Sequence, residues 1–168
     1  PYDFAKDLAP VGQIGSTPTV LVVAQASPIR TMDDLLRLAR SRTDAASYGS
    51  AGVSSFSHLA MEMIAKEADI RMLHVPYRGS APAFVDLIAG NLTVVLASFA
   101  SARPLLESGR LRGIVVTGPE RSSYAPELPT LAEVGLPRST IEYWWGLNVP
   151  AATPRPIINR LNATLNQV

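Results

Sequence analysis

Short apolar runs alternate with amphipathic segments along most of this chain, and this alternation restricts the folds open to it. The run Thr17–Val23 is rich in β-branched residues, whereas segment 31–41 places its apolar residues on one face of a helix. Further strands are predicted at 46–50, 71–75 and 92–98, and each precedes a segment with helical character. Because a strand, a helix and a second strand form one unit of parallel sheet, the pattern predicts an α/β fold whose parallel-rich sheet has helices on both faces.

Composition supports a folded core and removes several classes of function. Hydrophobic residues make up 47% of the 168 residues and charged residues 17%, which argues against disorder. The net charge of +1 and the scattered arginines do not indicate a nucleic-acid partner. The chain has no cysteine, so disulfides, thiolate chemistry and cysteine-based zinc sites are excluded. No apolar stretch approaches the ~20 residues that a membrane-spanning helix needs.

Residue spacing also predicts the local structure of the first two long helices. Thr31 is expected to cap the first, with Asp34 in the acidic position of a capping box. The buried face of that helix is expected to hold Met32, Leu35, Leu36 and Ala39. The second helix, which follows residue 55, is expected to bury Leu59, Met63 and Ile64, with Ala60 beside them. Its Glu62 and Lys66 are expected to form an exposed ion pair.

The last third of the chain is less regular. A strand at 111–117 leads into a loop rich in proline and polar residues, and a short helix is expected near 131–134. A strand at 141–150 and an amphipathic helix then close the sequence. Trp144 and Trp145 are adjacent on that strand and face opposite sides, so one of them should belong to the core.

Three junctions between a strand and a helix share an unusual composition. They are "GSAGVSS" (49–55), "PYRGS" (76–80) and "ASFAS" (97–101), which are small or hydroxylic and each open a helix. Ligands of parallel α/β sheets bind outside the carboxyl ends of the strands. The start of a helix offers unpaired N–H groups and a partial positive charge, which favour a carboxylate or a phosphate. We therefore expect the three junctions to form an anion site at one edge of the sheet.

Each residue of this proposed site also has a plainer interpretation. One of Ser54 and Ser55 is expected to be only a helix cap. Arg78 fits a surface arginine as well as a ligand contact. His58 fits a buried, hydrogen-bonded histidine better than a proton-transfer group, and His74, in mid-strand, is expected to be structural.

Motifs for catalysis are missing. The stretch "GVSSF" lacks the second glycine of a nucleophile elbow, and no acidic residue is obviously placed to complete a triad with a histidine. The phosphate-loop pattern and the H-E-x-x-H pattern are both absent. We therefore predict no catalytic residue, no metal ligand and no cofactor, and a protein that holds a small anion without reacting with it.

Several stretches resemble the substrate-binding receptors of tripartite tricarboxylate transporters, the Bug family. The resemblance lies in "YGSAG" followed by "SHL", in "VPYRGSAPAFVDLIAGNL", in "LRGIVVTGPERSSYAPELPTLAEVGLP" and in "WWGLNVPAATPRPIINRLN". It extends to the opening "PYDFAKDLAPVGQIGSTPTVLVV" and so covers essentially the whole chain. It implies a periplasmic receptor of the two-lobed, type II binding-protein architecture, whose lobes close around a small carboxylate and deliver it to a membrane permease.

The resemblance also implies ligand-binding positions and a division of the chain. The implied contacts are Ser50, Ala51, Gly52, Ser54, Ser55, Tyr77, Arg78, Gly79, Ser98 and Phe99. Residues 1–23 would be the end of the first lobe and a hinge strand, 24–140 the second lobe, and 141–168 the return hinge strand and the start of a first-lobe helix. The family often has glycine where this chain has Ser54, which predicts a tighter or differently angled loop because other residues resist a positive φ.

The chain starts at Pro1 without a signal peptide and without the family's first-lobe loop, so we expect a processed product or a fragment. Such a fragment would leave apolar surface uncovered and is expected to self-associate. Two other functions are compatible with the residues. One is a fragment of an α/β hydrolase or transferase that uses Ser54 or Ser55 with a histidine. The other is an effector-binding regulatory domain, which would need a DNA-binding segment upstream.

Overall fold

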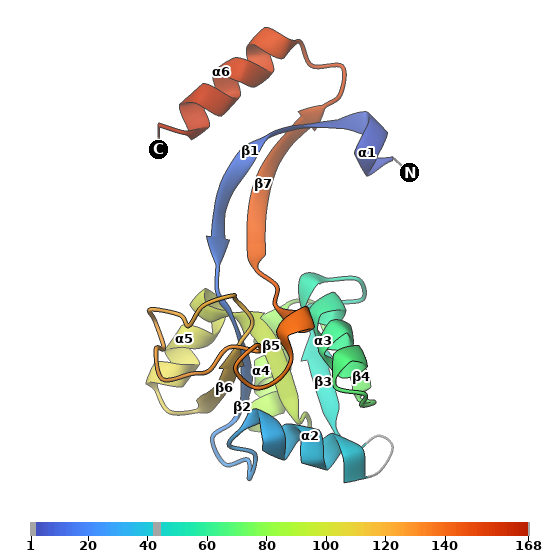
Figure 1. Cartoon of the computed structure of the whole chain (residues 1–168), viewed down its shortest axis with the longest axis vertical. Helices are drawn as coiled ribbons and strands as arrows, with labels where there is room; N and C mark the ends of the chain where they lie inside the picture. The colour runs from blue at the N-terminus through green and yellow to red at the C-terminus, as the bar shows by residue number, and fades with distance from the viewer. Residues whose placement is uncertain (1–2, 42–44, 168) are drawn as a thin grey trace. The chain divides into compact units, whose positions relative to one another are not determined.

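The computed structural model describes residues 3–41 and 45–167, and these form two compact units. One unit runs from Thr17 to Tyr143. The other combines the residues up to Ser16 with those from Trp144 onward. The fold of each unit is described by itself, with the elements labelled as in Figure 1.

The larger unit is built on a five-stranded sheet in the order β4-β3-β5-β2-β6. Its strands are β2 (Thr19–Ala24), β3 (Ser47–Ser50), β4 (Leu73–Pro76), β5 (Val94–Ser98) and β6 (Leu111–Val116). Strand β3 is parallel to β4 and β5, whereas β2 is antiparallel to both β5 and β6. The expectation of a parallel-rich α/β sheet is thus confirmed, with β2 as its one antiparallel member.

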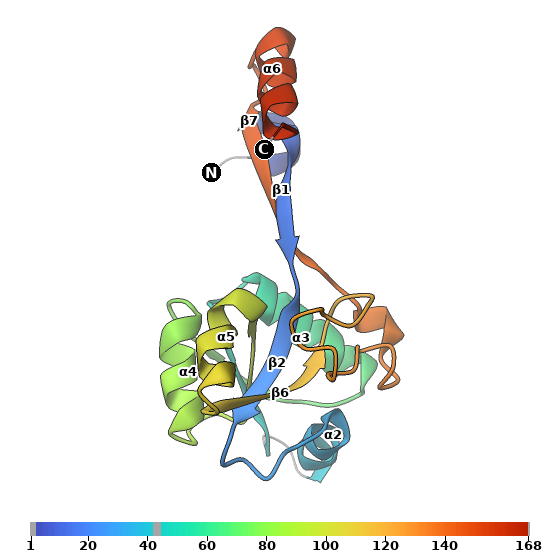
Figure 2. The same ribbon diagram turned by 90° about the vertical axis from the view of Figure 1, so that its left-hand side faces the viewer.

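Helices cover both faces of this sheet, as predicted (Figure 2). Helices α2 (Met32–Ser41) and α3 (Phe56–Glu67) pack on one face, while α4 (Ser80–Ile88) and α5 (Phe99–Glu107) pack on the other. Strand β2 supplies both cores, because Leu21 and Val23 point to the first face and Val20 and Val22 to the second. Its six residues are all buried, which explains why they read as a continuous apolar run.

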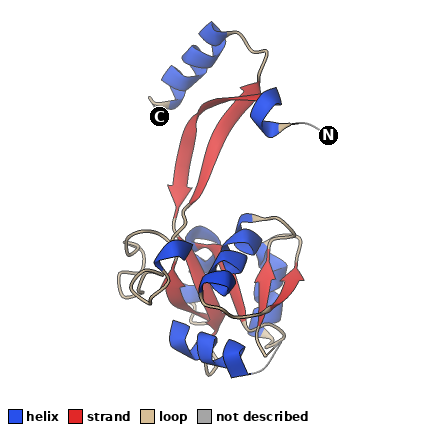
Figure 3. Cartoon of the chain, turned by 45° about the vertical axis from the view of Figure 1, so that its right-hand side comes forward, coloured by secondary structure: helices blue, strands red, loops and turns tan. Residues whose placement is uncertain are grey.

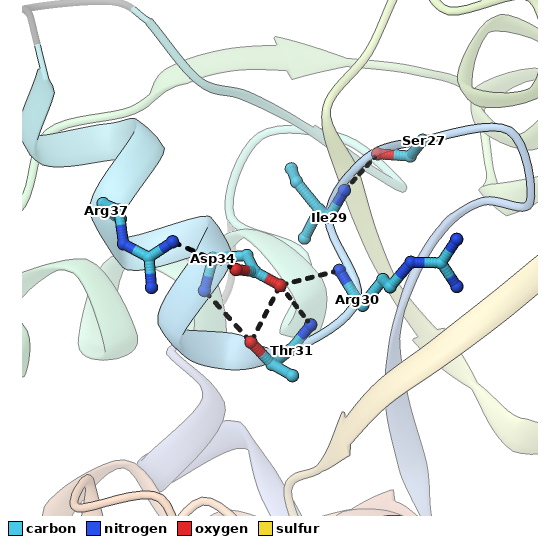
Figure 4. Close-up of polar contacts among 6 residues, drawn as sticks. All are labelled: Ser27, Ile29, Arg30, Thr31, Asp34 and Arg37. Atoms are coloured by element: carbon cyan, nitrogen blue, oxygen red, sulfur yellow. Dashed lines mark hydrogen bonds and ion pairs between the residues drawn. The ribbon is translucent and has the colours of Figure 1, made fainter.

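The start of α2 forms the predicted capping box (Figure 4). The Asp34 amide donates to Thr31 Oγ1 at 3.2 Å, and the Thr31 amide donates to Asp34 Oδ2 at 3.1 Å. Hydrogen bonds from the Arg30 amide and from Thr31 lower the pKa of Asp34 below its ordinary value. The predicted stripe is buried as well: Met32, Leu35, Leu36 and Ala39.

The predicted stripe of α3 is partly wrong. Ala60 and Ile64 are buried, but Leu59 is 54% exposed and Met63 38% exposed. The buried face is instead formed by Ser57, Ala60, Met61, Ile64 and Ala65. The expected pair of Glu62 with Lys66 does not form either, because Glu62 accepts a hydrogen bond from the Tyr48 hydroxyl at 2.5 Å.

The helix expected near 131–134 is a single turn. Thr130 and Glu133 do form reciprocal capping hydrogen bonds at 2.7 and 3.2 Å. However, Gly135 adopts a φ of +86° and ends the turn at once. A short 3₁₀-helix, η1 (Pro137–Ser139), follows in its place.

The smaller unit contains the two-stranded pair β1 (Leu8–Thr17) and β7 (Tyr143–Pro150), with helices α1 (Phe4–Asp7) and α6 (Arg155–Leu165) (Figure 3). The Asn162 side chain of α6 donates to the Val11 carbonyl of β1 at 2.6 Å. Trp144 is 59% exposed and Trp145 43%, so the expectation that one of them belongs to the core is wrong. Within this unit the residue of the ribbon that is buried is Val11 of β1, near α6.

Candidate functional site

The three predicted junctions lie along one edge of the sheet. Strands β4, β3 and β5 are neighbours and parallel, and their carboxyl ends are Pro76, Ser50 and Ser98. Each of these ends is followed by the start of a helix, α4, α3 and α5 respectively. This is the edge at which parallel α/β sheets bind ligands.

A pocket of about 180 Å³ opens beside these junctions, and each of the three contributes at least one residue to its lining. Its wall is rich in hydroxyl groups and contains no charged side chain. The lining residues are Thr19, Ala51, Ser55, Phe56, Ser57, Ser80, Leu96, Ala97, Ser98, Ser101 and Tyr143. Ala51, Ser55 and Ser98 therefore face the pocket among the predicted site residues.

Two serines cap the helices that begin at the pocket. Ser55 Oγ accepts from the His58 amide of α3 at 3.3 Å, and Ser98 Oγ accepts from the Ser101 amide of α5 at 3.3 Å. The first N–H groups of α3, those of Phe56 and Ser57, have no acceptor within the helix. The helix start therefore offers hydrogen-bond donors and a partial positive charge beside a neutral pocket.

The first junction is held by its own hydroxyl groups. Ser50 is only 1% exposed, and its Oγ accepts from the Gly52 amide at 3.2 Å and donates to the Gly52 carbonyl at 3.1 Å. The Ala51 amide donates to Ser57 Oγ at 3.0 Å. Ser54 adopts a φ of +63°, so this serine takes the left-handed conformation that glycine adopts without strain. Ser50 and Ser54 thus determine the conformation of the loop, whereas Ser55 lines the pocket.

The second junction contributes mainly backbone. The Tyr77 hydroxyl donates to Asp86 Oδ2 at 2.7 Å, and burial, with this carboxylate, raises the pKa of Tyr77 to about 12. Gly79 has a φ of +103° and leaves the start of α4 without a side-chain cap. Arg78 is exposed and makes no hydrogen bond or ion pair with any residue that the structure describes.

The third junction separates its two predicted residues. Ser98 lines the pocket, but Phe99 is 6% exposed and stacks on Tyr124 with ring centroids 5.4 Å apart. The Phe99 amide already donates to the Pro18 carbonyl at 2.9 Å. Because neither its side chain nor its amide is available, we leave Phe99 out of the proposed ligand contacts.

Comparison with known proteins identifies the family of this chain. A sequence model described as "TctC: Tripartite tricarboxylate transporter family receptor" matches residues 1–168. The chain belongs to this family. Members of the TctC family are solute-binding receptors rather than enzymes, and the chain has the α/β fold of the periplasmic binding proteins.

Relatives of this TctC chain include a curated protein and two solved structures. The UPF0065 protein in the tcbD-tcbE intergenic region of Pseudomonas sp. strain P51 is 40% identical over 168 residues, which are 99% of this chain and 50% of that protein. Rpa4515 of R. palustris, solved with adipate, is 34% identical with a TM-score of 0.88, over 98% of this chain and 55% of that one. MatC of Rhodopseudomonas palustris, with bound malate, is 28% identical with a TM-score of 0.88, over 99% and 56%. The chain spans about half the length of the curated relatives it matches.

Serine hydrolase chemistry is not supported by the geometry of this TctC chain. In the described part of the chain, the one contact between a serine hydroxyl and a histidine ring is Ser50 Oγ to His74 Nε2, at 2.6 Å. Ser50 is buried, and its hydroxyl is directed to the Gly52 carbonyl. The alternative nucleophiles Ser54 and Ser55 meet His58 only through backbone N–H groups.

Sequence reasoning missed several residues that line the pocket. Ser80 and Ser101 stood inside the quoted junctions and could have been chosen. Ser57 lies two residues past the first quoted junction, yet it is buried, lines the pocket and accepts a hydrogen bond from the Ala51 amide. Thr19 and Tyr143 come from the two segments that enter and leave the larger unit, where the local sequence gives no signal of a site.

Two further findings concern residues 3–41 and 45–167. No three of their histidine, aspartate or glutamate side chains are grouped so that they could hold a metal ion. None of the helices formed by these residues is both long and apolar enough to span a membrane.

Proposed function

We propose that this chain supplies the second ligand-binding lobe of a periplasmic receptor, which captures a small carboxylate and delivers it to the permease of a tripartite tricarboxylate-type transporter. The lobe would correspond to the unit Thr17–Tyr143, close to the predicted 24–140. Residues 1–23 and 141–168 would contribute hinge strands and a part of the first lobe.

One observation carries the proposal: a neutral pocket rich in hydroxyl groups lies where α3 and α5 begin, in a chain of a receptor family. Such a pocket offers donors and few acceptors that would repel an anion. Neutral donors and helix starts bind a carboxylate without the cost of burying a charged partner. Exposed Arg78, at the neighbouring junction, is available for long-range attraction of an anion.

The ligand class is a mono- or dicarboxylate. Solved relatives hold adipate and malate, both small dicarboxylates, at 34% and 28% identity. A thermal-shift screen of the full-length receptor against carboxylic acids, with inorganic phosphate as the comparison anion, tests the proposal. A ligand at a hundred times its Kd should stabilise the receptor by about 2.7 kcal/mol. Stabilisation by phosphate and by none of the acids would refute a carboxylate receptor.

The side chain of Ser55 provides a sharper test. Ser55→Ala in the full-length receptor is expected to weaken carboxylate binding by about 1–2 kcal/mol, because one hydrogen bond to a charged ligand is lost. Calorimetry with adipate measures the affinity. Thermal unfolding measures the loss of stability that follows from removing the N-cap of α3.

Thr31→Ala is the matched control, because it removes the cap of α2 at the opposite edge of the sheet. Both variants should lose about 1 kcal/mol of stability. Only Ser55→Ala should lose affinity. Equal loss of affinity in both variants would mean that Ser55 acts through helix stability alone.

A further inference from the structure

Two histidines stack beside the first junction, and the proposed ligand contacts use neither of them. The ring of His58, on α3, lies 3.9 Å from the ring of His74, on β4, between centroids, with the planes 8° apart. His74 stacks in turn on Tyr48 of β3 at 4.9 Å. The stack therefore joins three elements next to the loop from Ser50 to Ser55.

Each histidine holds one end of this loop. His74 Nε2 lies 2.6 Å from Ser50 Oγ, at the end of β3. The Ser54 amide, near the other end, donates to His58 Nδ1 at 2.9 Å. Ser54 has the left-handed φ of +63°, a conformation that persists only where surrounding contacts enforce it. The bond to His58 is such a contact.

These hydrogen bonds define the protonation of both rings. His58 Nδ1 must be unprotonated, because it accepts the Ser54 N–H. The contacts of Ser50 Oγ are all satisfied when its hydroxyl donates to the Gly52 carbonyl and His74 Nε2 carries the ring proton. Glu62 of α3 accepts a hydrogen bond from the Tyr48 hydroxyl of β3, and its charge acts on His74 by raising the pKa of that ring. Two charged imidazolium rings stacked at 3.9 Å would repel each other.

We propose that the His58–His74 pair positions the 50–55 loop for the ligand only while both rings are neutral, so that acidification releases the loop and lowers carboxylate affinity. This inference rests on the proposed function of the pocket. A proton on His58 Nδ1 would remove the acceptor of the Ser54 N–H, and the hydrogen bond between Ser54 and His58 would be lost. The two residues are positioning residues, because they act on the ligand through Ser50 and Ser54.

The stability of the fold should change with pH in the same direction. Burial, and then the charge of a protonated His58, lower the pKa of His74 below the ordinary histidine value of about 6.5, while Glu62 opposes the shift. The unfolded chain therefore binds more protons than the folded chain below that value. The stabilising contribution of neutral His74 is present above pH 6.5 and is lost as the pH falls through its folded pKa.

The test compares the full-length receptor with variants that keep or remove the hydrogen bonds. Calorimetry with adipate at pH 7.5 and 6.0 keeps the ligand largely ionised, since carboxyl groups titrate near pH 4. Wild type is expected to bind about twofold more weakly at pH 6.0, a change of about 0.4 kcal/mol. The variant H58N/H74Q keeps an acceptor near Nδ1 and a donor near Nε2 without titrating, so it should bind like wild type at pH 7.5 and lose the pH dependence. H58L, which has no acceptor, should bind at least about tenfold more weakly at both pH values.

A readout without ligand separates this inference from the proposed function. Exchange protection of the Ser54 amide, corrected for the intrinsic effect of pH, should fall between pH 7.5 and 6.0 in wild type and stay constant in H58N/H74Q. If no carboxylate binds wild type, the proposed function fails and the exchange data alone decide the role of the pair. The same pH dependence in wild type and H58N/H74Q would overturn the inference. If the double variant unfolds, H58N alone serves for the same comparison.

Discussion

Residues 1–168 alone are expected to bind a dicarboxylate at least about a hundredfold more weakly than the full-length receptor, a difference of about 2.8 kcal/mol. The reason is the size and openness of the pocket. Its volume of about 180 Å³ is below the roughly 300–1,000 Å³ of typical small-molecule sites, which bury most of the ligand surface. In an open pocket, hydrogen bonds to the ligand compete directly with water and contribute little.

Titration calorimetry of both chains with adipate measures this difference. Self-association has to be followed in parallel by sedimentation, because exposed Trp144 and Trp145 are expected to recruit a second copy when the rest of the receptor is missing. Equal affinity of the two chains, at protein concentrations where both are monomers, would contradict the two-lobed proposal. It would show instead that these residues contain a self-sufficient site.

The fold could be predicted because its signals are local and agree with one another. The buried run of β2 and the capping box of α2 are each determined by a few neighbouring residues, Thr31 and Asp34 among them. The face of α3 was harder to predict, since its apolar residues nearly surround the helix. Packing against the sheet selected Met61 rather than Leu59 and Met63, and no periodicity in the sequence distinguishes them.

The site could be predicted only in outline. Three junctions of like composition and a parallel sheet are enough to bring Ser55 and Ser98 to one edge. The pocket wall also needs Thr19 and Tyr143, which reach it from segments far apart in the sequence. Likewise, the stacking of His58 on His74 depends on how α3 lies over β4, which the sequence of neither element specifies.

Thr117 is expected to be the polar side chain that matters most for stability at this edge. It is fully buried, its hydroxyl contacts the buried hydroxyl of Thr19, and it donates to the Ile141 carbonyl at 2.8 Å. Thr19 opens β2 and Ile141 precedes β7, so Thr117 ties together the segments by which the chain enters and leaves the larger unit. Thr117→Val should lower the free energy of unfolding by about 2–3 kcal/mol, because buried polar partners lose their hydrogen bonds. Chemical denaturation measures the change.

Two further variants isolate the hydroxyl pair. Thr117→Ser keeps the hydroxyl and removes one methyl group, so it should lower the free energy of unfolding by only about 1 kcal/mol. The double variant T19V/T117V leaves no unpaired threonine hydroxyl and should be more stable than T117V alone, although the Ile141 carbonyl still lacks its donor. A double-mutant cycle yields the coupling between the two hydroxyls, expected to be about 1 kcal/mol. If the two losses simply add, the two hydroxyls are not coupled and each threonine side chain acts by itself.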